Sequence, residues 1–157
     1  MLALAIRHSP LFSLDIVFSK AERYPHAGQN GWYFHVTCAV PHSKGRFTYE
    51  GHDICFELDA FERFSQQLEA MRAGKAANAE LVEAGRMLTL ELTVEGRRTK
   101  CSVRIREAQA GNDMTVLSAA FGVDYDLFVN KLSDDLREFN RKLRESRAQL
   151  ERDSSAT

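Results

Sequence analysis

The stretch FELDAFERFSQQLEAM, from Phe56 to Met71, contains the change from a strand to a helix that organises the fold. Before Asp59, apolar residues alternate with polar ones, which is the period of a half-buried strand. After Asp59, apolar residues recur three and four positions apart, as they do on one face of a helix: Phe61, Phe64, Leu68 and Met71. We therefore predict a helix over residues 60–73, ended by Gly74, because glycine readily adopts the left-handed conformation of a helix end.

Two acidic residues predict how this helix begins. The Asp59 carboxylate can accept hydrogen bonds from the free N–H groups of the first turn. Glu62 follows three residues later, where a capping box has an acid and where the helix dipole favours negative charge. We expect Asp59→Ala to cost about 1 kcal/mol of stability.

Alternating apolar residues predict strands before this helix, over residues 12–18 and 32–40. Residues 45–58 break the alternation, because the apolar positions are odd-numbered at first and even-numbered from Ile54 onward. A bulge or a tight turn at residues 50–53 would repair this mismatch. The pattern fits one bulged strand and two short strands equally well. After the helix, we expect a short strand around Leu81.

A hairpin is predicted around Glu95-Gly96, since apolar residues alternate over 88–94 and again over 99–105. A two-residue turn there would pair Leu92 with Thr99 and place Glu91 opposite Lys100. A further strand is expected over residues 117–123.

A second helix is predicted after Asp124, which repeats the arrangement of a strand, an Asp cap and an apolar helix face. Its apolar spacing continues as far as Leu150, interrupted by Ser146. This continuation favours a weak homodimer through the C-terminal helix, or a helix end that folds back over the sheet. We expect the polar residues 151–157 to form a frayed tail.

Composition sets the class of protein. The 157 residues carry a net charge of −1, so no overall field draws the chain to nucleic acid or to a membrane. Three cysteines in apolar surroundings indicate reduced thiols and a cytoplasmic location. The run MLALAI is too short for a signal segment, and the sequence contains no membrane span, so we expect the mature chain to be as written. We predict a single α+β domain over residues 1–150, a mostly antiparallel sheet of about six or seven strands with two helices on one face.

The spacing of five residues resembles that of zinc ligands: His35, Cys38, His42, His52 and Cys55. Residues three apart on a strand point to opposite faces, so His35 and Cys38 cannot both reach one ion, and the same holds for His52 and Cys55. We therefore predict no metal.

No catalytic constellation is recognised either. The chain lacks a G-x-S-x-G, a Walker and a dinucleotide-binding glycine motif. Cys38 and Cys101 fall on apolar strand faces, and among the cysteines Cys55 alone points away from such a face. We predict no enzyme activity, no catalytic residues and no cofactor.

Four basic residues alternate along one predicted strand and so share one face; we call them the basic stripe: Arg98, Lys100, Arg104 and Arg106. Such a stripe can dock an acidic partner or phosphates. Few aromatic residues lie among them for base stacking, so we expect a protein partner and no nucleic acid.

The order of elements over Trp32 to Phe139, with FELDAFERF before one helix and FGVDYDLF before the next, resembles the WapI-type immunity proteins and related small bacterial domains. The resemblance implies a protein that neutralises a toxin of its own lineage. From the residues themselves we predict a protein-binding module that uses the basic stripe. A small-molecule-binding or catalytic domain is the alternative, and a polar pocket around Cys55 and His52 would favour it.

Overall fold

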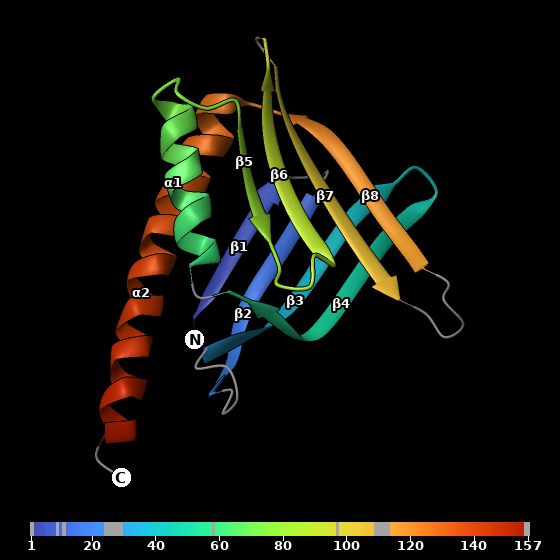
Figure 1. Cartoon of the computed structure of the whole chain (residues 1–157). Coiled ribbons are helices and arrows are strands. Elements are labelled where there is room, and N and C mark those ends of the chain that lie inside the picture. Colours follow the sequence, from blue (N-terminus) through green and yellow to red (C-terminus); the bar gives the residue numbers. More distant parts are fainter. Residues whose placement is uncertain are drawn as a thin grey trace.

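Two four-stranded antiparallel sheets face one another across one core, and two helices close one side of the pair (Figure 1). The computed structural model describes residues 2–8, 10, 12–23, 30–57, 59–96, 98–108 and 114–155. The strands of the first sheet are, in order, β1 (Ala3–His8), β2 (Phe12–Arg23), β3 (Asn30–His42) and β4 (Gly45–Phe56). Those of the second are β5 (Asn78–Val82), β6 (Leu88–Glu95), β7 (Arg98–Ala108) and β8 (Met114–Val123). The helices are α1 (Ala60–Arg72) and α2 (Asn130–Ser155), and one π-helical turn, η1 (Tyr125–Val129), precedes α2.

The α+β class and the antiparallel pairing are confirmed, but the prediction of a single sheet is wrong. The described residues form eight strands in two sheets rather than six or seven in one. Each sheet has one apolar face, and the facing sheet supplies most of its cover. The helices therefore do not lie on a sheet face. Instead, α1 packs against β5 and α2, while α2 contacts β1, so they close the side formed by the first strand of each sheet (Figure 1).

Strand β1 begins inside the run MLALAI and continues to His8, although from the sequence this run is considered only as a signal segment. Its side chains alternate between exposed and buried, with Leu4 and Ile6 in the core. Six residues are too few for their alternation to predict a strand from the sequence alone. The pairing of β1 with β2 shows that the segment is a strand.

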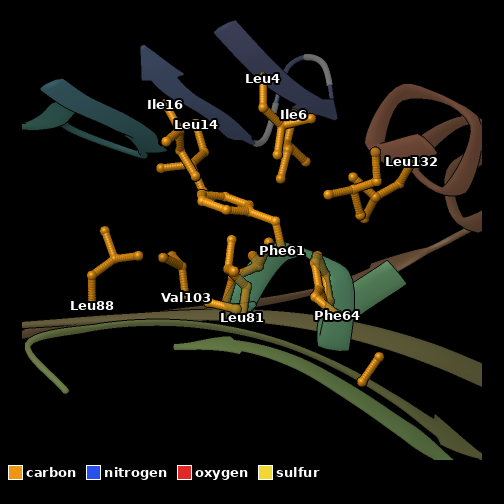
Figure 2. Close-up of a cluster of buried hydrophobic side chains, with 14 of the residues drawn as sticks. Leu4, Ile6, Leu14, Ile16, Phe61, Phe64, Leu81, Leu88, Val103 and Leu132 are labelled. Carbon is orange, nitrogen blue, oxygen red and sulfur yellow. The ribbon is translucent and has the colours of Figure 1, made fainter. Parts of the chain in front are cut away.

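Phe61 of α1 stands between the two sheets (Figure 2). Leu14 and Ile16 of β2 lie on one side of it, and Leu81 and Val103 of the second sheet lie on the other. All five side chains are almost completely buried. Burying a side chain of this size contributes roughly 1.5–3 kcal/mol, so the helix is held in place by the core that it fills.

The irregular stretch at residues 45–58 is one strand with a bulge, which settles the alternative that the pattern left open. Phe34 of β3 pairs with Ile54, but Val36 pairs with Gly51, so β4 has an extra residue opposite His35. Asp53 has φ 53°, a left-handed conformation that few non-glycine residues adopt.

The hairpin of β6 and β7 is confirmed, with a correction to its register. Leu92 pairs with Cys101 rather than Thr99, and Glu91 faces Ser102 rather than Lys100. The turn is centred one residue later than predicted, with Gly96 at φ 63°. The shift of pairing is two residues, which keeps every side chain on its predicted face.

The two helices begin differently. Asp59 makes no capping hydrogen bond to α1, and its carboxylate instead forms an ion pair with Arg63, so the predicted cap is wrong. The cap predicted at Asp124 is confirmed, because Asp124 Oδ1 accepts a hydrogen bond of 2.9 Å from the N–H of Leu127. Gly74 ends α1 with φ 68°, as predicted.

Helix α2 packs most of its apolar residues within its own chain. The buried members are Leu132, Leu136, Phe139 and Leu143, whereas the side chain of Leu150 lies outside the described residues. These buried residues are not available to a dimer contact, and the homodimer through the C-terminal helix stays a prediction. Residues 151–155, predicted to be frayed, continue the helix, and residues 156–157 lie outside the description. Within the described chain, neither helix combines the length and the apolar character needed to cross a membrane.

Candidate binding surface

A hollow of about 590 Å³ lies on the outer face of the β5–β8 sheet, with α1 as one wall. Helix α1 is fixed beside the sheet by the Gln67 side chain, whose Oε1 accepts a 2.8 Å hydrogen bond from the N–H of Glu80 in β5. This contact uses a donor on the outer edge of the sheet, so the helix covers β5. The floor of the hollow is formed by the side chains that point away from the core.

Three of the four predicted stripe residues line this hollow: Lys100, Arg104 and Arg106. They alternate along β7 with residues buried in the core, such as Val103, so strand geometry turns all three outward. Arg98, the fourth, lies at the start of β7 opposite Glu95 and is exposed, but it does not line the hollow. The structure thus brings three members of the basic stripe into one concave surface.

No carboxylate among the described residues forms an ion pair with these three cations. The neighbouring strand β8 places only small side chains beside two of them, with Gly122 opposite Lys100 and Ser118 opposite Arg104. On the other side, Arg104 faces Thr89 of β6. Glu91 of β6 faces Ser102, between these two cations, and also lines the hollow, so the small neighbours leave the charged groups open mainly on the β8 side.

The opposite wall of the hollow carries acids. Glu57 accepts a 2.8 Å hydrogen bond from Arg63 of α1, and that contact comes first among those that raise the pKa of the arginine. Glu83 is buried, and its two oxygens accept from the N–H groups of Gly85 and Met87 at 2.7 and 2.8 Å. These two acids are engaged by neighbouring groups. Glu80 and Glu91 also line the hollow and form no ion pair among the described residues, so the hollow carries charge of both signs and the cations of β7 form its basic row.

An apolar strip continues this surface at the end of β8. Met114 and Val116 are 56% and 53% exposed, and Val116 pairs with Arg106 across the strands. Strand β8 is also the outer strand of its sheet, and no backbone hydrogen bond joins its outer edge to another described segment. Exposed apolar side chains beside Arg are typical of protein interfaces, and an open strand edge can accept a partner's strand.

The cysteines are placed for structure rather than for nucleophilic attack. Burial raises the pKa of Cys38 to about 11 and that of Cys101 to about 12. Burial also raises the pKa of Cys55, and the nearby Glu83 adds to this effect. Thiols of this kind are protonated at neutral pH. Neither Cys55 nor His52 lines the hollow.

The residues with zinc-like spacing in the sequence do not all meet at one site in the structure. Cys38 is buried in the core, whereas His35 lies on the outer face of the same strand. The side chain of His42 lies outside the described residues. The side chains of His35 on β3 and His52 on β4 lie close together, and that of Glu50 lies close to both. Sequence spacing missed this group because its members lie on two strands. The signal that could have found it was the parity break near residues 50–53.

Comparisons of the chain with models of protein families, with curated proteins and with solved structures gave no match. The resemblance to immunity proteins stays a prediction.

Proposed function

We propose that this chain is a protein-binding module that docks an acidic partner on the outer face of β7 and β8. The observation that carries the proposal is the row of Lys100, Arg104 and Arg106 in a concave surface, without an ion pair among the described residues. Cations that form no ion pair within the described part of the chain are available to the carboxylates of another chain.

The electrostatics favour recognition more than raw affinity. Opposite charges steer two proteins together and can raise association rates about 10- to 1,000-fold at low salt. The apolar side chains of Met114 and Val116 lie beside the stripe and can supply the dehydrated centre that an interface also needs. The hollow, the stripe and the open edge of β8 then form one continuous docking surface.

The resemblance stated above makes a toxin the partner under this proposal, and the chain would act by covering part of the toxin's surface. The three free thiols, two of them buried, suit a reducing compartment, so we place this encounter in the cytoplasm. A blocker of this type needs complementary shape and charge and no catalytic group.

A small anionic molecule is the second candidate, and the volume of the hollow favours it. About 590 Å³ falls in the usual range for ligand pockets. Such pockets are mostly apolar, whereas this one is lined largely by charged and hydroxyl side chains, which fits a hydrated protein contact better.

Charge reversal tests the proposal. The double variant Lys100→Glu with Arg104→Glu removes the centre of the stripe. Its matched control, Arg46→Glu with Lys75→Glu, makes the same change in net charge at exposed positions outside the hollow. Binding of a poly-glutamate peptide, a single-stranded oligonucleotide and pyrophosphate is measured at one salt concentration. Circular dichroism checks that each variant is folded.

We expect the wild type and the control to bind the poly-glutamate peptide, and the stripe variant to bind it at least about 10-fold more weakly. A protein cross-linked to the wild type in its source cell, then purified, should show the same dependence. Equal peptide binding by both variants would discard the stripe. Tighter stripe-dependent binding of the oligonucleotide or of pyrophosphate would replace the protein partner with that class of ligand.

A further inference from the structure

The outer face of the first sheet carries a second chemical cluster, far in sequence from the basic stripe. It consists of His35 on β3 with Glu50 and His52 on β4. Glu50 and His52 are two residues apart on one strand, so both point to the same face. His35 faces the bulge of β4, where two residues oppose one. The bulge therefore brings His52 beside His35.

The three side chains are within reach of one another. His35 Nδ1 lies 2.9 Å from His52 Nδ1, and the two rings are 4.4 Å apart between centroids. Glu50 Oε1 lies 3.3 Å from His35 Nε2 and 3.7 Å from His52 Nε2. One ligand atom from each residue falls within 4.8 Å of the others.

The short contact between the rings joins their Nδ1 atoms, whereas Glu50 contacts their Nε2 atoms, and one ligand atom from each residue lies within 4.8 Å of the others. The rings must therefore turn to bring one set of ligand atoms around a small divalent cation. Zinc bonds of about 2.0–2.1 Å at tetrahedral angles put neighbouring ligand atoms roughly 3.3–3.4 Å apart. A modest rotation of either imidazole would direct one nitrogen of each ring to a common point. Two imidazoles and one carboxylate are also a donor set that zinc uses in proteins, with a fourth position left for water.

We propose that His35, Glu50 and His52 form a zinc-binding site on the outer face of β3 and β4. The side chains of His52 and Glu50 are largely exposed, so an ion can enter from solvent without rearrangement of the core. Two charged groups near the cluster, Lys20 and Asp53, form an ion pair with each other at 3.6 Å. That pairing leaves the Glu50 carboxylate as the anionic ligand.

The site would clamp β4 across its bulge. Asp53, next to His52, has positive φ, which costs free energy that a bound ion can offset. A ligand that binds the folded chain alone raises its stability in proportion to the logarithm of its concentration. Zinc should therefore raise the melting temperature of the wild type.

The experiment uses metal-free protein without a histidine tag, titrated with zinc in competition with a chromophoric chelator. The test variants are His52→Ala and Glu50→Gln. The matched control is Asp53→Asn, which removes a neighbouring carboxylate and keeps a residue type that tolerates positive φ. A second control, Cys55→Ser, removes the least buried thiol. Circular dichroism without zinc reports whether each variant is folded.

We expect one zinc per chain in the wild type and in both controls. Each test variant should bind more than about 10-fold more weakly, because loss of a ligand costs more than loss of a group that merely orients one. Zinc should raise the melting temperature of the wild type and leave that of His52→Ala unchanged. Absence of stoichiometric binding, equal affinity in wild type and His52→Ala, or one zinc per two chains would overturn the site.

Discussion

The two halves of the molecule repeat one plan. Strands β1–β4 are followed by α1, and strands β5–β8 are followed by α2, each sheet with its strands in sequence order. The inner faces are alike, since both supply alternating apolar residues to one core. The outer faces differ: β4 is bulged and carries the histidine cluster, whereas β7 carries the basic stripe. The repeated plan provides stability, and the chemistry that distinguishes the halves lies on their outer faces.

The strongest test of the shared core is Phe61→Ala. Phe61 of the first half has its ring centroid 4.9 Å from that of Phe139 in the second half, and 5.3 Å from that of Phe34 in β3. Removing a buried Phe ring leaves a cavity, and we expect a loss of about 3–5 kcal/mol in urea unfolding. The control Leu127→Ala, at a site 77% exposed, should stay within about 0.5 kcal/mol of wild type. An equal loss of unfolding free energy in Phe61→Ala and Leu127→Ala would contradict the shared core.

A smaller loss is expected from Asn140→Ala, which removes a polar link between the halves. Asn140 of α2 is buried, and its Nδ2 donates a 3.1 Å hydrogen bond to the carbonyl of Phe61. The variant removes this second hydrogen bond while the carbonyl of Phe61 keeps its helical donor, so we expect a cost of about 0.5–1.5 kcal/mol in the same measurement. Gln66→Ala, on the exposed surface of α1, serves as control. If both variants unfold at the same urea concentration, the link carries no stability.

The starts of the two helices offer a direct comparison. Asp124→Ala should cost about 1 kcal/mol, because it removes the hydrogen bond to the N–H of Leu127. Asp59→Ala should cost less than about 0.5 kcal/mol, since Asp59 makes only an exposed ion pair with Arg63. Thermal unfolding of both variants measures the difference. A larger loss at Asp59 would mean that it caps α1 in solution.

The smallest effect concerns the surface of α2. Hydrogen bonds from Arg141 and Lys142 lower the pKa of Glu138 from 4.5 to about 2. A lowered carboxyl pKa stabilises the folded chain above the ordinary value of 4.5, and this contribution disappears as pH falls toward 2. Glu138→Gln should therefore be slightly less stable than wild type at neutral pH and equal to it in strong acid. High salt should also remove this difference in stability. A difference that grew on acidification would contradict a stabilising ion pair at Glu138.

Much of the fold could be predicted because apolar periodicity reports which face of an element is buried. The switch at Asp59, the hairpin at Gly96 and the cap at Asp124 are local patterns, and the structure contains them. The division into two sheets could not be predicted, since both arrangements present the same alternation along each strand. The capping failure at Asp59 has a local cause, because Arg63 competes for the same carboxylate.

The candidate sites show the same limit. The basic stripe lies on one strand, so alternation alone placed its members on one face. The wall that makes the surface concave comes from α1, which only the packing of α1 against β5 reveals. The histidine cluster needs the pairing of β3 with β4 and the bulge between them, and a spacing rule along one strand cannot find it.

The central claim is that the two outer faces bind different partners independently, and one crossed measurement tests it most directly. Zinc and the poly-glutamate peptide are each titrated into His52→Ala and into the double variant Lys100→Glu with Arg104→Glu. We predict that the histidine variant loses zinc binding and keeps peptide binding, while the stripe variant does the reverse. Folded variants that lose both ligands together, or that lose neither, would contradict the account.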